Sequence, residues 1–401
     1  MNNYPTYKLG DVADYINGRA FKPKEWKEKG LPIVRIQNLN DENAEYHYSD
    51  VTHEDKYLLH NGDLLFAWAA SLGTYIWNSG DAWLNQHIFK VIPKENVSKK
   101  YLYYALTSII KELYAKSHGS GMVHVTKDKF VNTEIPLPPL STQHQIVSRI
   151  ESLFAELDKA VQHLRTAQQQ IKTYRQAVLN HWLNNDEGKW EMVKLGEVAE
   201  KIFDGPFGTH LKSDDYVSSG IRVVRLENIK SGYFDDSKQS FVTPEKYETI
   251  KRHTVYPTDL IMSTFISEEV KVCQMPEYIG FAVNKADCIG IRLKPDVSAD
   301  YIKYYLSLRS VYHELEIQVH GATRPRVNTT QIKNIEVSLP PLSEQQRIVE
   351  EIETRLSQAE AAEARIAESL QKTEALRQSI LKKAFSGELV VSTGSTTANC
   401  G

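Results

Sequence analysis

The sequence contains one unusual junction twice. "LPPLSTQHQIV" at residues 137–147 returns as "LPPLSEQQRIV" at residues 339–349, 202 positions later. Over the fifteen positions that begin at Leu137 and Leu339, ten are identical. This is too many for chance in a window with two consecutive prolines, and an internal repeat constrains the fold of the whole chain.

The duplication covers nearly the whole sequence. Further pairs of segments match at spacings that grow from 186 to 202: residues 7–16 with 193–202, 30–39 with 220–229, 96–106 with 296–306, and His118-Gly with His320-Gly. The growing spacing predicts small loop insertions early in the second copy. Toward the end of the unit the spacing is constant, so the register between the two copies is fixed there.

Both copies have the same predicted layout. Short apolar runs punctuated by Gly, Asn and Pro predict strands within residues 31–36, 63–69, 87–92, 221–226, 259–263 and 288–293. One amphipathic helix follows in each copy, at residues 99–114 and 299–315. At the junction, the prolines exclude regular hydrogen bonding, and Ser141 or Ser343 is the predicted N-cap of a long helix. Gln346 would complete a capping box with Ser343.

Apolar residues in both long helices follow the spacing of a coiled coil. In the first helix, a continuous 4-3 seam is formed by Ile146, Ile150, Leu153, Leu157, Ala160, Leu164, Ala167, Ile171, Tyr174 and Val178. In the second helix the predicted seam is less regular, with Arg355, Ser369 and Thr373 at inward positions among Ile348, Ile352, Ala359, Ala362, Ile366, Leu376 and Ile380. We expect the two helices to pair antiparallel, because each leads from one globular part toward the other.

Composition limits the class of protein. The net charge of −3 argues mildly against a nucleic-acid binder, but residues 343–375 alone carry −4, and basic residues gather at 17–30 and 322–333. Cys273, Cys288 and Cys400 form no CxxC pair, which disfavours a zinc ribbon or a disulfide framework. The sequence contains neither a secretory signal nor an apolar run long enough to span a bilayer, so we expect a cytoplasmic protein.

The motifs of the common enzyme classes tested are missing. There is no GxxxxGK[ST] phosphate loop and no GxGxxG after a strand. Both Pro-Pro pairs are flanked by leucines, whereas an amino-methyltransferase needs a polar residue before the prolines and an aromatic one after them. The histidines lack the spacing of metal ligands.

Two copies of the pattern KLGxVA, VRxxN, HG and LPPLSxQxxIV, each followed by a long helix, resemble the specificity (S) subunit of type I restriction–modification enzymes. The resemblance extends from Tyr7 to Leu389. It implies an α+β fold: two similar target recognition domains joined by two long antiparallel coiled-coil helices, with a pseudo-twofold internal duplication. The implied boundaries are 1–140 and 186–342 for the domains, 141–185 and 343–386 for the helices, and 387–401 for a flexible tail.

The resemblance also implies a non-catalytic reader of double-stranded DNA in a restriction system for phage defence. Each domain would read one half of a bipartite asymmetric site, and the helices would set the spacer and dock two modification subunits for adenine methylation. Restriction subunits would join through the complex. S-adenosylmethionine, ATP and magnesium are expected on those partner subunits, and no metal or cofactor is expected on this chain.

Positions that differ between matched copies are the candidates for reading different half-sites, because shared positions serve folding or phosphate contact. Arg35/Arg225 and Asn38/Asn228 match, and we interpret them as scaffold first and phosphate contact second; Gly119 and Gly321 also match. Divergent polar residues suited to base edges or phosphates are Arg19, Lys22, Lys24, Trp68, Ser71, Asn85, Gln86, His87, Ser120, His124, Lys127, Thr209, His210, Lys212, Ser213, Thr264, Arg324, Arg326 and Asn328. Arg324 and Arg326 are the strongest single candidates.

This choice compares residues 68–75 with residues 263–270, and residues 85–87 with residues 284–286.

Two other functions share part of the pattern. A single-chain pseudo-dimeric DNA-binding regulator would also have two domains, but no helix-turn-helix is visible. A coiled-coil scaffold without DNA binding would not need divergent polar loops on matched frames.

Overall fold

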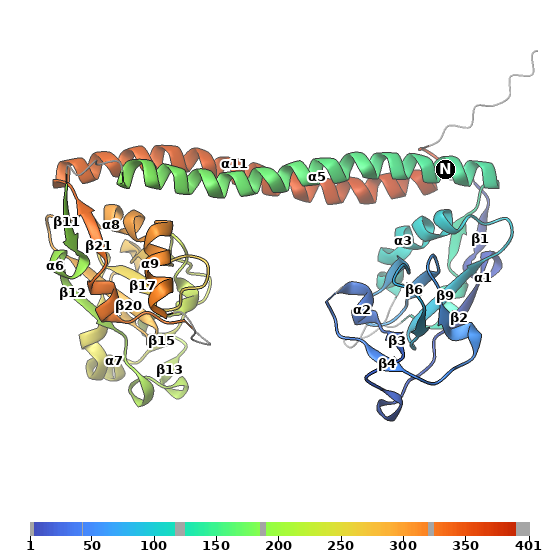
Figure 1. The fold of residues 1–401 in the computed structure, drawn as a ribbon, viewed down its shortest axis with the longest axis horizontal. Helices are drawn as coiled ribbons and strands as arrows, with labels where there is room; N and C mark the ends of the chain where they lie inside the picture. Colours follow the sequence, from blue (N-terminus) through green and yellow to red (C-terminus); the bar gives the residue numbers. More distant parts are fainter. Residues whose placement is uncertain (1–3, 42, 117–124, 185–189, 320–324, 390–401) are drawn as a thin grey trace, which may run out of the picture. The chain divides into compact units, whose positions relative to one another are not determined.

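The computed structural model describes residues 4–41, 43–116, 125–184, 190–319 and 325–389. It divides into two compact units, with Met1–Leu164 and Ala367–Gly401 in unit 1 and Arg165–Ile366 in unit 2. Each unit has one globular α+β part and one segment from each of two long helices, α5 (Leu140–Leu183) and α11 (Leu342–Ser386), as Figure 1 shows.

Two four-stranded sheets form the globular part of unit 1. One has the strand order β2 (Ala13–Asn17), β9 (Ile88–Pro93), β6 (Leu64–Ala67), β7 (Gly73–Ile76). The other has the order β4 (His47–Ser49), β3 (Leu31–Val34), β8 (Ala82–Leu84), β5 (Leu58–Leu59). Within the second sheet β3 and β8 run parallel, while the other pairs are antiparallel.

Unit 2 repeats this topology with one additional edge strand in its second sheet. Its first sheet has the order β12 (Ala199–Asp204), β20 (Cys288–Leu293), β17 (Leu260–Ser263), β18 (Val272–Gln274). Its second has the order β13 (Tyr216–Val217), β15 (Phe241–Val242), β14 (Ile221–Val224), β19 (Ala282–Asn284), β16 (Thr254–Val255), with β14 and β19 parallel. The predicted duplication is therefore confirmed at the level of strand pairing.

Short elements complete both units. In unit 1 they are β1 (Thr6–Lys8), β10 (Glu134–Pro136), α1 (Leu9–Val12), α2 (Ile36–Asn40), α3 (Lys99–Lys116), α4 (Lys127–Val131) and the 3-10 turns η1 (Pro23–Glu25) and η2 (Asp55–Tyr57). In unit 2 they are β11 (Glu191–Lys194), β21 (Glu336–Leu339), α6 (Leu195–Val198), α7 (Pro244–Ile250), α8 (Ala299–Leu306), α9 (Arg309–Val319), α10 (Thr329–Lys333), η3 (Gly208–His210), η4 (Ser213–Asp215), η5 (Leu226–Asn228), η6 (Lys251–His253) and η7 (Glu277–Ile279). None of the described helices is long and apolar enough for a bilayer span.

Both proline junctions have a glutamine two residues after the serine, and its hydrogen bonds explain why. Gln143 is buried, and its Oε1 accepts from the amide of Ser98 (2.8 Å) while its Nε2 donates to the carbonyls of Asn96 (3.0 Å) and Pro138 (2.9 Å). Gln345 makes equivalent bonds from Ser298 and to Pro340 in unit 2, both at 2.8 Å. This side chain ties the start of each long helix to the loop before α3 or α8.

The predicted serine N-cap is wrong in both copies. α5 begins at Leu140 and α11 at Leu342, so Ser141 and Ser343 lie inside the first turn. The carbonyl of Pro139 accepts from the amide of Gln143 (3.0 Å), and Pro341 has the same role in α11. A proline can occupy this position because the missing amide hydrogen would have no intrahelical partner there.

The second predicted amphipathic helix is interrupted. α3 is continuous, but α8 ends at Leu306 and α9 begins at Arg309. Gln176 of α5 spans the break in unit 2, since its Nε2 donates to the carbonyl of Ser307 (3.2 Å) and its Oε1 accepts from the amide of Arg309 (3.1 Å). A partner on another helix therefore satisfies backbone groups that a continuous helix would pair internally.

The predicted seam of α5 is mostly confirmed. Eight of its ten residues are buried or half-buried, whereas Ala160 and Tyr174 are exposed. Within unit 1, Ile146 and Ile150 of α5 belong to the same core as Leu381 and Phe385 of α11. Because early residues of α5 meet late residues of α11, the two segments pair antiparallel.

The predicted register of α11 is wrong in its middle part. Leu356, and not Arg355, is buried, and Leu376 is 50% exposed. The side chains that face inward step by four and three through Ile352, Leu356, Ala359, Glu363, Ile366, Leu370, Thr373, Arg377 and Ile380. Polar side chains interrupt the apolar pattern at Glu363 and Arg377, and this makes the seam difficult to detect by hydrophobicity.

Each unit pairs a seam arginine with an acid of the other long helix. Arg377 pairs with Asp158 in unit 1 and lies 4.9 Å from the ring of Phe154. Arg175 pairs with Glu363 (2.9 Å) and lies 3.9 Å from Glu360 in unit 2. Arg175 and Arg377 are 202 positions apart, as are Asp158 and Glu360, so the ion pairs obey the internal duplication.

Candidate nucleic-acid interface

Divergent segments of unit 1 meet through backbone hydrogen bonds. The amide of Gln86, in the link between β8 and β9, donates to the carbonyl of Arg19, after β2 (2.9 Å). The amide of Trp68, after β6, donates to the carbonyl of His87 (3.1 Å). The amide of Val125, before α4, donates to the carbonyl of Trp68 (3.2 Å). Segments that are distant in the sequence are thus joined in one place in the fold.

Unit 2 repeats this frame with different side chains. The amide of Thr264 donates to the carbonyl of Asp287, and the amide of Val327 donates to the carbonyl of Thr264, both at 2.9 Å. These bonds repeat those that Trp68 makes in unit 1. Because backbone groups form them, the side chains at these positions can change without loss of the frame.

A glycine permits the close approach in each unit. A Cβ atom on Gly18 would lie 1.9 Å from the carbonyl oxygen of Asn85, and one on Gly205 would lie 2.0 Å from the carbonyl carbon of Lys285. Any larger residue would displace backbone. The loop after β2 or β12 therefore needs glycine to lie against the strand link.

The residue before β9 or β20 is left-handed in both units. His87 has φ 72° and Asp287 has φ 71°. Asp and His are among the non-glycine residues that adopt this region most often. Its repetition at matched positions indicates that the frame, and not the local sequence, fixes this conformation.

Side chains give the two regions different chemistry. In unit 1 the ring of Trp68 lies 4.9 Å from that of His87, and its Nε1 donates to Oδ1 of Asn17 (3.0 Å). In unit 2, Arg326 pairs with Asp287 (Nη1 to Oδ1, 3.1 Å), and its guanidinium carbon lies 4.4 Å from the ring centre of Phe265. At the matched positions, unit 1 therefore has a contact between two rings, whereas unit 2 has an ion pair stacked on a ring.

The pKa of one carboxyl group in this region, that of Asp204, is raised. Burial, together with the nearby carboxylate of Asp287, raises the pKa of the Asp204 carboxyl, and Lys333 partly offsets the effect. Asp204 ends β12 as Asn17 ends β2, and their strand partners β20 and β9 are equivalent. Unit 2 therefore has an acid where unit 1 has an amide.

Comparison with known proteins identifies the family. A family model described as the type I restriction modification DNA specificity domain matches residues 1–164 and again residues 187–372. The chain belongs to this family.

Relatives in this family are similar over most of their length. The type I restriction enzyme EcoBI specificity subunit of Escherichia coli is 26% identical over 408 residues, which cover 95% of this chain and 85% of the relative. The MjaVIII specificity subunit of Methanocaldococcus jannaschii is 24% identical and covers 88% and 86%. The EcoKI specificity subunit of Escherichia coli strain K12 is 24% identical and covers 95% and 88%.

Two solved structures share the fold. A chain from a study of complex assembly and conformational transition of the type I R-M system has a TM-score of 0.73 at 20% identity and covers 96% of this chain and 98% of that one. The HsdS subunit from Thermoanaerobacter tengcongensis has a TM-score of 0.52 at 20% identity and covers 97% and 98%. At this identity the likeness shows the fold.

The strand pairing corrects the alignment made from the sequence. Trp68 corresponds to Thr264 and not to Ser263, since both amides bond to the carbonyl of the left-handed residue. Asn85 corresponds to Lys285 and not to Asn284, because their amides donate to the equivalent strands β3 and β14. His87 therefore corresponds to Asp287, a residue that the sequence comparison missed.

Several of the residues predicted to contact DNA instead make contacts within their own loop or are buried. Arg19 pairs with Glu25 (2.5 Å), and its backbone belongs to the frame. Asn328 caps α10 by accepting from the amide of Gln331 (3.0 Å). Thr264 is buried. These contacts orient the loops that carry the exposed candidates.

Other predicted residues are more accessible. Gln86 is an exposed member of the frame, and Ser71 is half-buried in the turn after β6. Away from the frame bonds, the exposed candidates are Lys22, Lys24, Lys127, His210, Lys212 and Ser213. Ser120, His124 and Arg324, with the matched Gly119 and Gly321, lie outside the described residues, as does the side chain of Thr209.

The matched asparagines form part of the scaffold. Asn38 and Asn228 are buried, and the Oδ1 of each accepts from the amide of the preceding arginine, Arg35 (3.1 Å) or Arg225 (2.9 Å). Each Nδ2 donates to two carbonyls of the following loop. These contacts support the scaffold interpretation.

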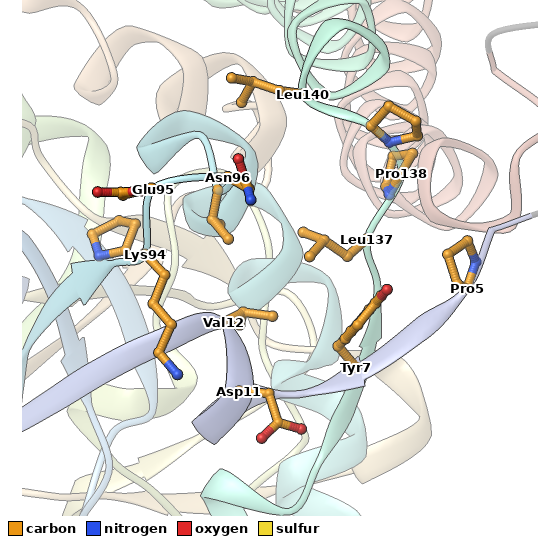
Figure 2. Close-up of a pocket in the computed structure, with 13 residues that line it drawn as sticks. Pro5, Tyr7, Asp11, Val12, Lys94, Glu95, Asn96, Leu137, Pro138 and Leu140 are labelled. Carbon is orange, nitrogen blue, oxygen red and sulfur yellow. The ribbon is translucent and has the colours of Figure 1, made fainter.

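A cavity of about 940 Å³ lies in unit 1 beside the proline junction, and Figure 2 shows its lining. Tyr7, Leu137 and Leu140 are among the residues that line it, and Lys94 donates to the carbonyl of Gly10 (3.4 Å). Among the described residues, no cluster of three or more His, Cys, Asp or Glu side chains could hold a metal ion.

Proposed function

We propose that the chain is the DNA-reading subunit of a type I restriction–modification complex, with each unit reading one half of a bipartite, asymmetric site. The observation that carries this proposal is the matched backbone frame with different side chains in the two units. Trp68 and His87 occupy the positions at which unit 2 has Thr264 and Asp287. Equal frames with unequal side chains are what two readers of unequal sequences require.

Sequence choice would come from the divergent side chains named above, and phosphate contact from the exposed lysines. Arg326 remains the strongest described candidate, because its planar fork matches guanine O6 and N7. Because the net charge of the chain is −3, partner subunits would supply much of the phosphate contact.

The long helices would set the spacer between half-sites and dock two modification subunits. The antiparallel ion pairs of Arg175 and Arg377 support a defined register, since charged seam residues penalise alternative pairings. The chain itself would be non-catalytic and cytoplasmic. S-adenosylmethionine, ATP and magnesium would bind the modification and restriction subunits, which are the proposed sources of methylation, translocation and cleavage.

The spacer role can be tested by lengthening both helices. One heptad inserted after Leu164 and one after Ile366 preserves the 4-3 seam and adds about 10 Å of helix. This length corresponds to about three base pairs at ~3.4 Å each. Sequencing of methylated sites in cells that express the variant with its modification subunits should return both original half-sequences and a longer unspecified gap.

Insertion of a heptad into α5 alone is the matched control. It adds seven residues, two of them seam positions without partners on α11, and should reduce methylation without a defined new gap. An active double insertion that retains the original gap, or that recognises different half-sequences, would contradict the proposed roles. Purified chain that methylates or cleaves DNA by itself would contradict the non-catalytic assignment, and gel shifts with and without modification subunits would identify which assembly binds.

A further inference from the structure

The two frames differ most clearly at the left-handed residue before β9 or β20, which is His87 in unit 1 and Asp287 in unit 2. His87 and Asp287 have the same backbone conformation and accept the same backbone hydrogen bond. A glycine would adopt this conformation without strain, but both units have a residue with a polar side chain. The backbone accommodates glycine, histidine and aspartate alike here, so the two units differ at this position in what the side chains contact.

In unit 2 the side chain of Asp287 holds Arg326. Its Oδ1 lies 3.1 Å from Nη1 of Arg326, and the ring of Phe265 lies beneath the guanidinium at 4.4 Å. The ion pair and the ring contact together restrict the orientation of the guanidinium group. The side chain of Arg326 is nevertheless 48% exposed. A guanidinium held on one edge and one face still presents its remaining donors outward.

We infer that Asp287 determines sequence specificity by positioning Arg326 on a G·C base pair, an inference that rests on the proposed DNA-reading function. Arg326 would donate to guanine O6 and N7, which is the commonest specific arginine contact. The carboxylate would orient that fork through its ion pair with Arg326. At the matched position of unit 1, His87 next to Trp68 would read a different base pair.

The decisive variants are Asp287→Gly and Asp287→Asn in the full complex with its modification subunits. Glycine accommodates φ 71° without strain, so the thermal stability of unit 2 should be unchanged or higher. Asparagine retains the shape and tolerates the same backbone but removes the charge. Methylation of a library of degenerate sites should show that one G·C position of one half-site loses about tenfold or more in preference.

Two further variants test the route through Arg326. His87→Gly is the matched control and should change preference only in the other half-site. Asp287→Gly in an Arg326→Ala background should have no additional effect on preference, because a positioning residue acts only through its partner. If Asp287 served only the fold, its substitution would lower the thermal stability of unit 2. Base preference and overall methylation would then change together with that stability.

The outcomes separate the two levels of proposal. If the wild-type complex methylates no bipartite sequence, the proposed function fails. If the wild-type complex is specific but Asp287→Gly and Asp287→Asn methylate the same sequences with the same preferences, the assignment of Asp287 is overturned. Loss of unit 2 stability in Asp287→Gly would also overturn it, because the residue would then be required for folding.

Discussion

Replacement of Gln143 by leucine should selectively destabilise unit 1. The residue is 1% exposed and makes three hydrogen bonds to backbone groups at 2.8–3.0 Å. Leucine has a similar volume but leaves the amide of Ser98 and two carbonyls without their partner. At about 1 kcal/mol net for each bond, the expected loss is about 3 kcal/mol of unfolding free energy for unit 1.

Urea unfolding of the full chain, combined with hydrogen exchange, can assign the loss to one unit. The amide of Ser98 should lose protection in Gln143→Leu, while the amide of Ser298 should not. Gln345→Leu should show the reverse pattern, with about 2 kcal/mol lost from its two bonds. Gln145 is exposed in the same helical turn, so Gln145→Leu is the matched control. If Gln143→Leu costs no more than that control, the clamp does not stabilise the junction.

Three other substitutions test separate parts of the structure. Arg377→Met should cost no more than about 1 kcal/mol in urea unfolding, because the Asp158 side chain is 67% exposed; a loss several times larger would contradict this. Gly18→Ala should cost about 3 kcal/mol and lower the Tm of unit 1, since its Cβ would lie 1.9 Å from a backbone oxygen. Asp204→Asn should raise the Tm of unit 2 at pH 7, and the gain should disappear toward about pH 4. Burial and Asp287 raise the pKa of the Asp204 carboxyl, so the native state resists its ionisation as pH rises; a gain independent of pH would refute this reasoning.

The repeat predicted the larger architecture because a duplicated sequence must satisfy the same hydrogen bonds twice. The register of α11 was not predictable from apolar spacing alone. Glu363 and Arg377 face inward, and each is neutralised by an opposite charge on α5. The duplication contained the missing signal, since Arg175 and Arg377 are 202 positions apart. A comparison of charged positions at this spacing would have identified the seam.

The candidate site was predicted as a set of divergent loops, but not as a connected frame. The one-residue error between Trp68 and Thr264 arose because loop lengths differ between the copies. The strand pairing and the hydrogen bonds to His87 and Asp287 reveal the register. A left-handed Asp leaves no local sequence signature comparable to that of glycine. The break at Ser307 was also hidden, because its partner Gln176 belongs to a different helix.

The pattern of identity between the copies follows from which atoms make the hydrogen bonds. Where a side chain bonds to backbone, as Gln143 and Asn38 do, a substitution leaves buried polar groups unpaired, and the same residue occurs in both copies. Where backbone bonds to backbone, as at Trp68 and His87, the side chain makes none of the frame bonds. Such positions can diverge at little cost to folding, and they lie where the two units differ in chemistry. A duplicated frame can therefore present two different sets of side chains without a change in its backbone hydrogen bonds.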